Sequence, residues 1–152
     1  MVIGLLLISL LVLSGVAKSV KDTLDHHFET SIFKDLNPMF WDSGISWYNK
    51  WEKDSLIKFG KAKERFWGSS RWFVFLTDAW HLFDTIQSTC WQLAMSICIQ
   101  KGLLLYSLGI ICNEKYDFLY IIGHILIIKL LVSIPFEVTY SKLFIKKNEK
   151  SI

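Results

Sequence analysis

The sequence predicts an all-α integral membrane protein, a helix bundle of three spans with long cytoplasmic helix extensions and a tryptophan-rich interfacial loop. Hydrophobic residues make up 52% of the 152 residues and gather in separate blocks, which is typical of membrane proteins. Charged residues gather elsewhere, because residues 18–71 hold 18 of the 31 Asp, Glu, Lys and Arg side chains. Only two prolines are present, so long uninterrupted helices are expected.

Composition also excludes several classes of protein. An aromatic content of 15% is too high for a disordered chain. Three cysteines are too few, and odd in number, for a disulfide-stapled secreted domain. A net charge of +3 is too weak to indicate a nucleic-acid partner. The length suits one domain, so residues 1–152 are treated as a single membrane domain whose principal partner is the lipid bilayer.

Residues 2–17 form the first predicted span. Ser9 and Ser14 are the only polar side chains among them, and sixteen helical residues rise about 24 Å. A cleaved signal peptide is the alternative, because residues 13–17 end in small side chains. A retained anchor is favoured, since no Lys or Arg precedes the apolar run. Apolar spacing predicts that this helix continues for about thirty residues in all, through Val16, Val20, Leu24, Phe28 and Ser31.

Residues 34–71 form the predicted interfacial cap. Asn37-Pro38 and Asp42-Ser43-Gly44 are turn signals. No apolar run long enough to span a membrane occurs here, and charges of both signs alternate with aromatic side chains. Because Trp and Tyr prefer the headgroup zone of a bilayer, we expect this segment to cover the cytoplasmic ends of the helices. Free amides and Arg71 in residues 68–71 suggest an anion site.

The second and third spans are predicted at about residues 86–112 and 118–136. Residues 18–71 hold ten basic side chains and the C-terminal tail holds four, so both regions are expected in the cytoplasm. Two crossings must then separate them, which gives three spans and an external N-terminus. If residues 103–112 crossed separately, there would be four spans and the tail would lie outside.

A polar stripe marks the second long helix. At about 100° per residue, its members fall within one arc, and a polar face is costly against lipid. We therefore expect the stripe to face protein or water, and we favour bonds to neighbouring helices for its members Ser88, Thr89, Gln92 and Ser96. The stripe consists of Asp78, His81, Thr85, Ser88, Thr89, Gln92 and Ser96.

Asp78 and His81 are the candidate catalytic residues. Their i, i+3 spacing makes them neighbours on one helix face. A carboxylate in that position can orient an imidazole and raise its basicity, for a general base or for a metal ligand. The alternative is a structural hydrogen bond that holds the cap on the bundle.

Topology suggests a larger metal set. His27, Asp78, His81 and Glu137 all lie near helix ends that should meet at one membrane surface. Two histidines and two carboxylates suit zinc or iron. The predicted function is metal-assisted hydrolysis of a lipid-linked substrate at the cytoplasmic interface. The alternative is a non-catalytic assembly or scaffold subunit, which would bind another copy of the chain or a membrane partner. A cavity reaching Asp78 and His81 would favour the first.

Two strings carry a resemblance that covers about residues 20–100. They are Phe40-Trp41-Asp42-x-x-x-Ser46-Trp47-x-Asn49-Lys50-Trp51 and Thr77-Asp78-Ala79-Trp80-His81-Leu82-Phe83. Together they resemble a family of small, functionally uncharacterised bacterial integral membrane proteins. The resemblance implies a bacterial or phage-borne protein of the inner membrane, and it implies no activity.

Overall fold

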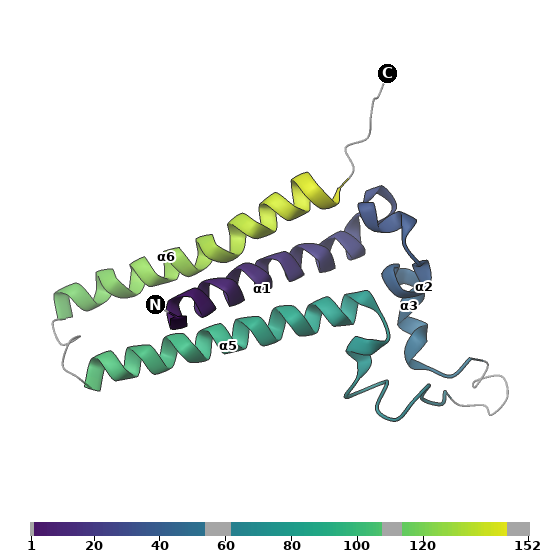
Figure 1. Cartoon of the computed structure of the whole chain (residues 1–152), viewed down its shortest axis with the longest axis horizontal. Coiled ribbons are helices and arrows are strands. Elements are labelled where there is room, and N and C mark those ends of the chain that lie inside the picture. Colours follow the sequence, from purple (N-terminus) through teal and green to yellow (C-terminus); the bar gives the residue numbers. More distant parts are fainter. Residues whose placement is uncertain (1, 54–61, 108–113, 146–152) are drawn as a thin grey trace, which may run out of the picture.

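The computed structural model describes residues 2–53, 62–107 and 114–145, with side chains from residue 120 onward in the last range. Within these ranges every regular element is helical (Figure 1), so the all-α class is confirmed for this part of the chain. Three long helices dominate, α1 (Val2–His26), α5 (Ala79–Ser107) and α6 (Glu114–Val138). Residues 108–112 of the predicted second span and 146–152 of the basic tail lie outside the described residues.

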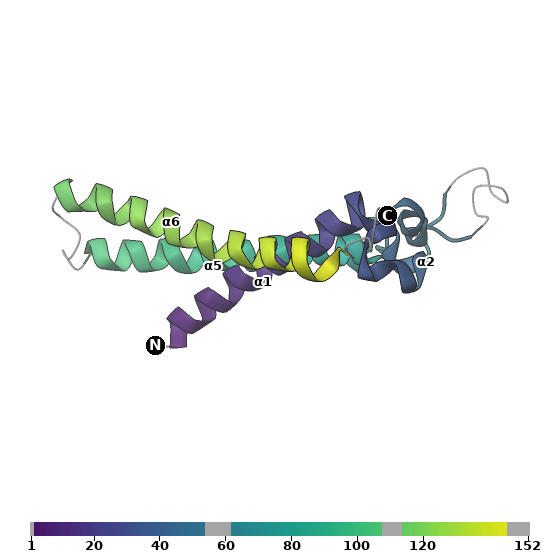
Figure 2. The same ribbon diagram turned by 90° about the horizontal axis from the view of Figure 1, so that it is seen from above.

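Helix α1 lies between the other two (Figure 1). It runs antiparallel to α5, because its contact at Ser14 is with Gln87, whereas Lys21 reaches Asp84 further back in α5. It runs parallel to α6, where Gly15 meets Val132 and Ser19 bonds to Thr139. Figure 2 shows that the N-terminal half of α1 diverges from α5 and α6 at the end far from the cap.

Short helical elements build the cap at the other end of the bundle (Figure 1). Asn37 caps α2 by accepting from the Met39 amide at 3.0 Å, and Asp42 caps α3 through the Gly44 amide at 2.9 Å. Both predicted turns therefore start helices. The cap elements are η1 (Phe28–Thr30), η2 (Ile32–Asp35), α2 (Pro38–Trp41), α3 (Ser43–Ser46), η3 (Trp47–Lys50) and η4 (Val74–Leu76), and the π-helical η5 (Thr139–Phe144) continues α6 to the same end.

The main apolar core lies where the cap meets the helices. Val20, Leu24, Phe33 and Ala79 are buried together, with aromatic side chains of the cap packed around them. The prediction that α1 extends to Ser31 is wrong, since the helix ends at His26. The carbonyl of Leu24 instead accepts from the Ser43 hydroxyl at 3.1 Å. A side chain of the cap thus satisfies a carbonyl at the end of the helix.

Helix α5 departs from the sequence-based expectation in two ways. It runs unbroken through residues 100–102, so residues 103–107 continue one helix and do not form a separate crossing. The outer members of its polar stripe, Ser88, Thr89, Gln92 and Ser96, are exposed in this single chain. The prediction that they face the bundle is therefore wrong for the isolated chain. The Ser88 and Ser96 hydroxyls bond to carbonyls of their own helix.

Two helices in the described residues are long and apolar enough to cross a membrane. They are Val2–His26 and Tyr120–Phe144, which contain 18-residue stretches with mean hydropathies of 2.2 and 2.0, respectively. These correspond to the first and last predicted spans. Residues 86–107 of α5, the described part of the predicted second span, do not reach that apolarity.

The backbones of α1 and α6 approach closely at Gly15. A Cβ atom built on Gly15 would lie 2.3 Å from the carbonyl oxygen of Val132. No real Cβ comes that near to a backbone oxygen, so α6 lies at this distance only because residue 15 lacks a side chain.

Replacing Gly15 with alanine should therefore push α1 and α6 apart. The expected cost is about 1–3 kcal/mol of unfolding free energy, the usual range for an overpacked contact. Gly123→Ala is the matched control, because nothing lies within 4 Å of a Cβ at that helical position. It should be neutral or stabilising by up to about 1 kcal/mol. Thermal unfolding in detergent micelles measures both, and equal melting temperatures for the two variants would contradict the contact.

Candidate functional site

Asp78 is the N-cap of α5. Its Oδ1 atom accepts from the backbone amide of His81 at 2.8 Å, and its carbonyl accepts from Leu82 at 3.2 Å. This is the bonding pattern of a capping aspartate. The Thr77 hydroxyl donates to Oδ2 at 3.2 Å. With only 1% of its surface exposed, Asp78 is a buried carboxylate surrounded by donors, as such a group requires.

The same carboxylate holds the His81 ring. Nδ1 of His81 lies 2.9 Å from Oδ1 and 2.7 Å from Oδ2 of Asp78. When the carboxylate is ionised and the ring is neutral, Nδ1 must be the donor, because an ionised carboxylate only accepts, and Nε2 is then the acceptor. The His81 side chain is 27% exposed. A fixed imidazole with an available Nε2 is the arrangement of a general base.

A cavity of about 270 Å³ reaches this pair. It lies where the end of α1, the short helix α3 and the start of α5 meet. The Ser46 hydroxyl borders it, is buried, and has no hydrogen-bond partner within the described residues. The lining consists of Asp25, Ser43, Gly44, Ser46, Trp47, Asp78, Trp80 and His81.

Polar contacts between α1 and α5 fix one wall of the cavity. The Trp80 indole N–H donates to the Asp25 carboxylate at 2.8 Å. One turn away, Lys21 forms a 2.8 Å ion pair with Asp84, and its ammonium lies 5.3 Å from the centroid of the Trp80 ring. These contacts hold Trp80 edge-on against His81, with ring centroids 5.0 Å apart. The imidazole is therefore positioned from two sides.

The structure does not bring the predicted metal set together. His27 packs edge-on against Tyr140 of η5, with ring centroids 5.6 Å apart, and Glu137 is exposed on α6. Among the described residues, no group of three or more His, Cys, Asp or Glu side chains is placed to hold a metal ion. The physical reason is the position of α1, which separates the α5 side, with Asp78 and His81, from the α6 side, with His27 and Glu137. These residues do not fit zinc or iron.

Ser46 and Asp25 are the residues that complete the site around the predicted pair. Asp25 is close to His27 in sequence, but it faces α5. Ser46 lies in the first of the two resemblance strings, yet no spacing rule connects it with residues 78–81. Only the folding of the cap onto α5 brings it to the same cavity.

The turn of residues 68–71 already holds an anion of the chain itself. The Glu64 carboxylate accepts from the backbone amides of Gly68 at 3.0 Å and Ser70 at 3.3 Å, and from the Ser70 hydroxyl. The hydroxyl bond, followed by the amide bond from Gly68, lowers the pKa of Glu64 below its usual range. The backbone of Gly68 in this turn has a positive φ of 76°, a conformation that glycine adopts without steric cost. The donors of the predicted anion site are therefore bonded to the carboxylate of Glu64, within the cap itself.

Comparison of the chain with models of protein families, with curated proteins and with solved structures finds no match.

The two roles of Asp78 can be separated by substitution. Asparagine is as good an N-cap as aspartate, whereas alanine accepts nothing. Asp78→Ala should therefore lower the free energy of unfolding by about 1 kcal/mol more than Asp78→Asn. Thermal unfolding followed by circular dichroism in detergent measures the difference. Equal losses in both variants would mean that the bond to the imidazole, and not the cap, is what stabilises the start of α5.

Proposed function

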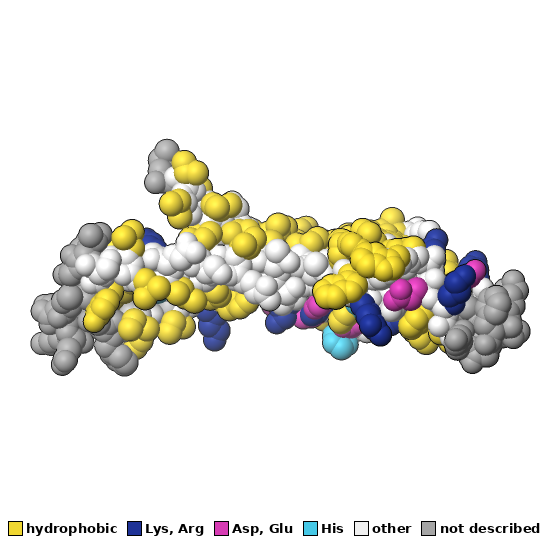
Figure 3. Space-filling view, turned by 90° about the horizontal axis from the view of Figure 1, so that it is seen from below, with side chains coloured by type: hydrophobic (Ala, Val, Ile, Leu, Met, Phe, Trp, Pro, Cys, Tyr) yellow, Lys and Arg dark blue, Asp and Glu magenta, His cyan; other side chains and the backbone are white. Residues whose placement is uncertain are grey.

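We propose that this protein is integral to a bacterial inner membrane and that Asp78 and His81 act there as a general-base pair on a lipid-linked substrate. Support for the membrane comes first from the surface. Side chains such as Ile125, Leu130 and Ile134 are each more than half exposed on α6. Figure 3 shows hydrophobic side chains along the bundle and most of the charged ones on this face toward the cap. Soluble monomers rarely expose apolar faces of that extent.

The helix directions support three crossings. Helices α1 and α6 are the two most apolar, and both run toward the cap (Figure 1). Two parallel spans need a returning segment between them, and α5 runs antiparallel beside α1. Its 29 residues rise about 43 Å, enough to cross a bilayer, and residues 85–100 carry no charged side chain. The exposed polar stripe on α5 would then bond to a second copy or to a membrane partner.

Cysteine labelling tests this topology. In a variant whose native cysteines are replaced by alanine, single cysteines are placed at Lys34, Tyr106 and Lys142, all exposed positions. An impermeant maleimide added from the cytoplasmic side should label positions 34 and 142 but not 106, because the basic cap and the end of α6 lie on the same side. Labelling of positions 34 and 106 from one side and 142 from the other would refute three spans.

The proposed chemistry is hydrolysis of an ester. Nε2 of His81 takes a proton from water as the water oxygen attacks the ester carbon, and the same proton then passes to the leaving alcohol oxygen as the ester bond breaks. Asp78 remains ionised and stabilises the imidazolium ion formed in between. Ser46 offers a buried hydroxyl to the oxygen on which negative charge develops. The observation that carries this proposal is the cavity that the pair shares with Ser46.

A lipid-linked substrate agrees with the place of the cavity. The cap lies at the end of the apolar helices, so an ester at headgroup depth can reach His81 while its acyl chain stays in the bilayer. A volume of about 270 Å³ admits the reacting group and little more.

Lipid turnover tests the hydrolysis. Purified protein is reconstituted into vesicles of a bacterial polar lipid extract, and the lipids are followed by mass spectrometry. The wild type should consume at least one lipid species, and His81→Ala should slow this at least about 100-fold, the usual contribution of a general base. His26→Ala is the matched control, since His26 is exposed at the end of α1. A wild type that consumes no lipid, or an undiminished His81→Ala rate, would refute the proposal.

A structural role is the second candidate. The Ser43–Leu24 bond then holds the cap on α1, the Asp25–Trp80 bond holds α1 on α5, and the bond between the Asp78 carboxylate and the His81 ring only stabilises the start of α5. In that case His81→Ala should lower thermal stability and the yield of any co-purifying membrane partner, with the lipid composition unchanged.

A further inference from the structure

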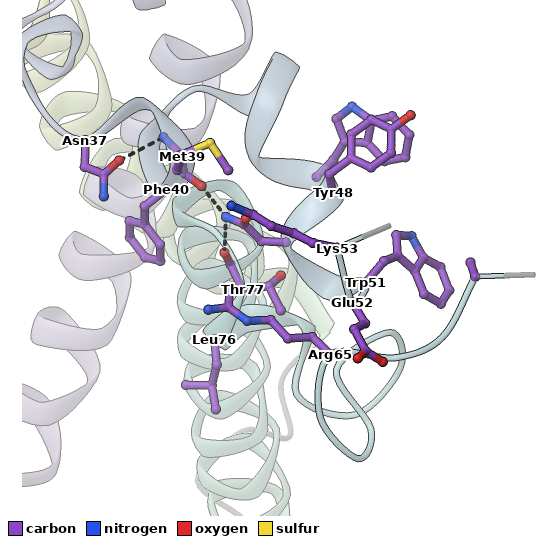
Figure 4. Close-up of a pocket in the computed structure, with 13 residues that line it drawn as sticks. Asn37, Met39, Phe40, Tyr48, Trp51, Glu52, Lys53, Arg65, Leu76 and Thr77 are labelled. Carbon is purple, nitrogen blue, oxygen red and sulfur yellow. Dashed lines mark hydrogen bonds between the residues drawn. The ribbon is translucent and has the colours of Figure 1, made fainter. Parts of the chain in front are cut away.

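The cap contains a second, larger cavity (Figure 4). Its volume of about 960 Å³ is in the range of small-molecule sites. It is separate from the cavity at His81 but adjacent to it, because Trp47 borders both and Thr77 directly precedes Asp78. Its lining residues are Asn37, Met39, Phe40, Trp47, Tyr48, Asn49, Trp51, Glu52, Lys53, Ala62, Arg65, Leu76 and Thr77.

The charge in this cavity is unbalanced. Of its three charged lining residues, Glu52 is paired with Lys63 at 2.9 Å. The ammonium of Lys53 and the guanidinium of Arg65 form no hydrogen bond or ion pair with the described part of the chain. Figure 4 shows the Lys53 side chain extending toward Met39 and the Arg65 side chain extending toward Thr77. Two unpaired cations in one cavity are complementary to an anion, and an arginine fork matches a phosphate in particular.

The walls are suited to an amphiphile. Asn49 fixes one wall by donating to the carbonyls of Met39 and of Thr77, the latter at 3.1 Å. Aromatic side chains supply much of the remaining surface, and Trp47, Met39 and Leu76 are all more than 40% exposed. Trp and Tyr with one polar edge are typical of headgroup depth.

We infer that this cavity binds the phosphate headgroup of an anionic phospholipid, with Lys53 and Arg65 contacting the phosphate oxygens and the aromatic wall contacting the glycerol region. A lipid is favoured over a soluble phosphate compound because the cavity lies at the cap end of the apolar helices and its exposed lining is apolar. This inference rests on the membrane location proposed above, and it does not depend on hydrolysis at His81.

Lipid titration tests the inference. Protein in a non-ionic detergent is titrated with phosphatidylglycerol or with phosphatidylcholine, and bound lipid is counted by native mass spectrometry. Phosphatidylglycerol should bind at least about tenfold more tightly, because the choline cation of phosphatidylcholine would lie near Lys53 and Arg65 and be repelled by them, although both lipids carry the phosphate. Arg65→Gln and Lys53→Gln should each remove about that factor. Both positions are exposed, so the variants should fold, and circular dichroism verifies this.

Lys34→Gln is the matched control. It removes the same charge from the cap, but Lys34 is paired with Glu29 at 2.9 Å and lies outside the cavity. Its affinity for phosphatidylglycerol should equal that of the wild type. An equal loss in Lys34→Gln would indicate general surface charge and overturn the inference, as would a lack of preference for phosphatidylglycerol.

Two further outcomes are decisive. Inorganic phosphate that displaces phosphatidylglycerol at comparable concentration would identify a soluble anion as the ligand and overturn the lipid assignment. Lipid bound through Arg65 by a protein that consumes no lipid would refute the proposed hydrolysis and leave this site standing.

Discussion

The position of α1 between α5 and α6 determines the rest of the arrangement. Gly15 lets the α6 backbone approach α1, while Lys21 and Asp25 hold the opposite face of α1 to α5. Because α1 contacts both neighbours, the ends of all three helices are held in fixed register where they meet the cap. The cavity at His81 is a product of this arrangement, since each of its walls comes from a different one of the elements that meet there.

Asp78 concentrates two demands in one side chain. Its carboxylate accepts a hydrogen bond from a backbone amide in the first turn of α5, and it also holds the ring of His81. Ser, Thr, Asn and Asp all serve as N-caps, and in Asp78 both carboxylate oxygens also lie within hydrogen-bond distance of Nδ1 of His81. The neighbouring Asp25 and Lys21 hold α1 against α5.

The sequence predicted what depends on local spacing and missed what depends on the path of the chain. Asp78 and His81 are three residues apart on one helix, so their contact follows from helix geometry. The helical class and the cap follow from apolar blocks and turn residues. His27 and Glu137 lie at the expected end of the bundle. A span count, however, does not predict on which side of α1 a side chain lies, and these two lie on the α6 side, away from Asp78 and His81. Ser46 carried no signal, because its proximity to His81 arises only from the folding of the cap.

The hydroxyls along α1 have a consequence for the order of biosynthesis. The Ser19 and Thr23 hydroxyls donate to carbonyls of α1 itself, at 2.8 and 2.7 Å, as does the Ser9 hydroxyl at 2.9 Å. In the membrane topology proposed above, a chain made from its N-terminus would place α1 in the bilayer before α5 and α6 exist. Three of the four hydroxyl groups of α1 are therefore satisfied inside the helix and need no partner during that interval. In that topology the central helix would be stable in lipid on its own, and the two later helices would assemble on it.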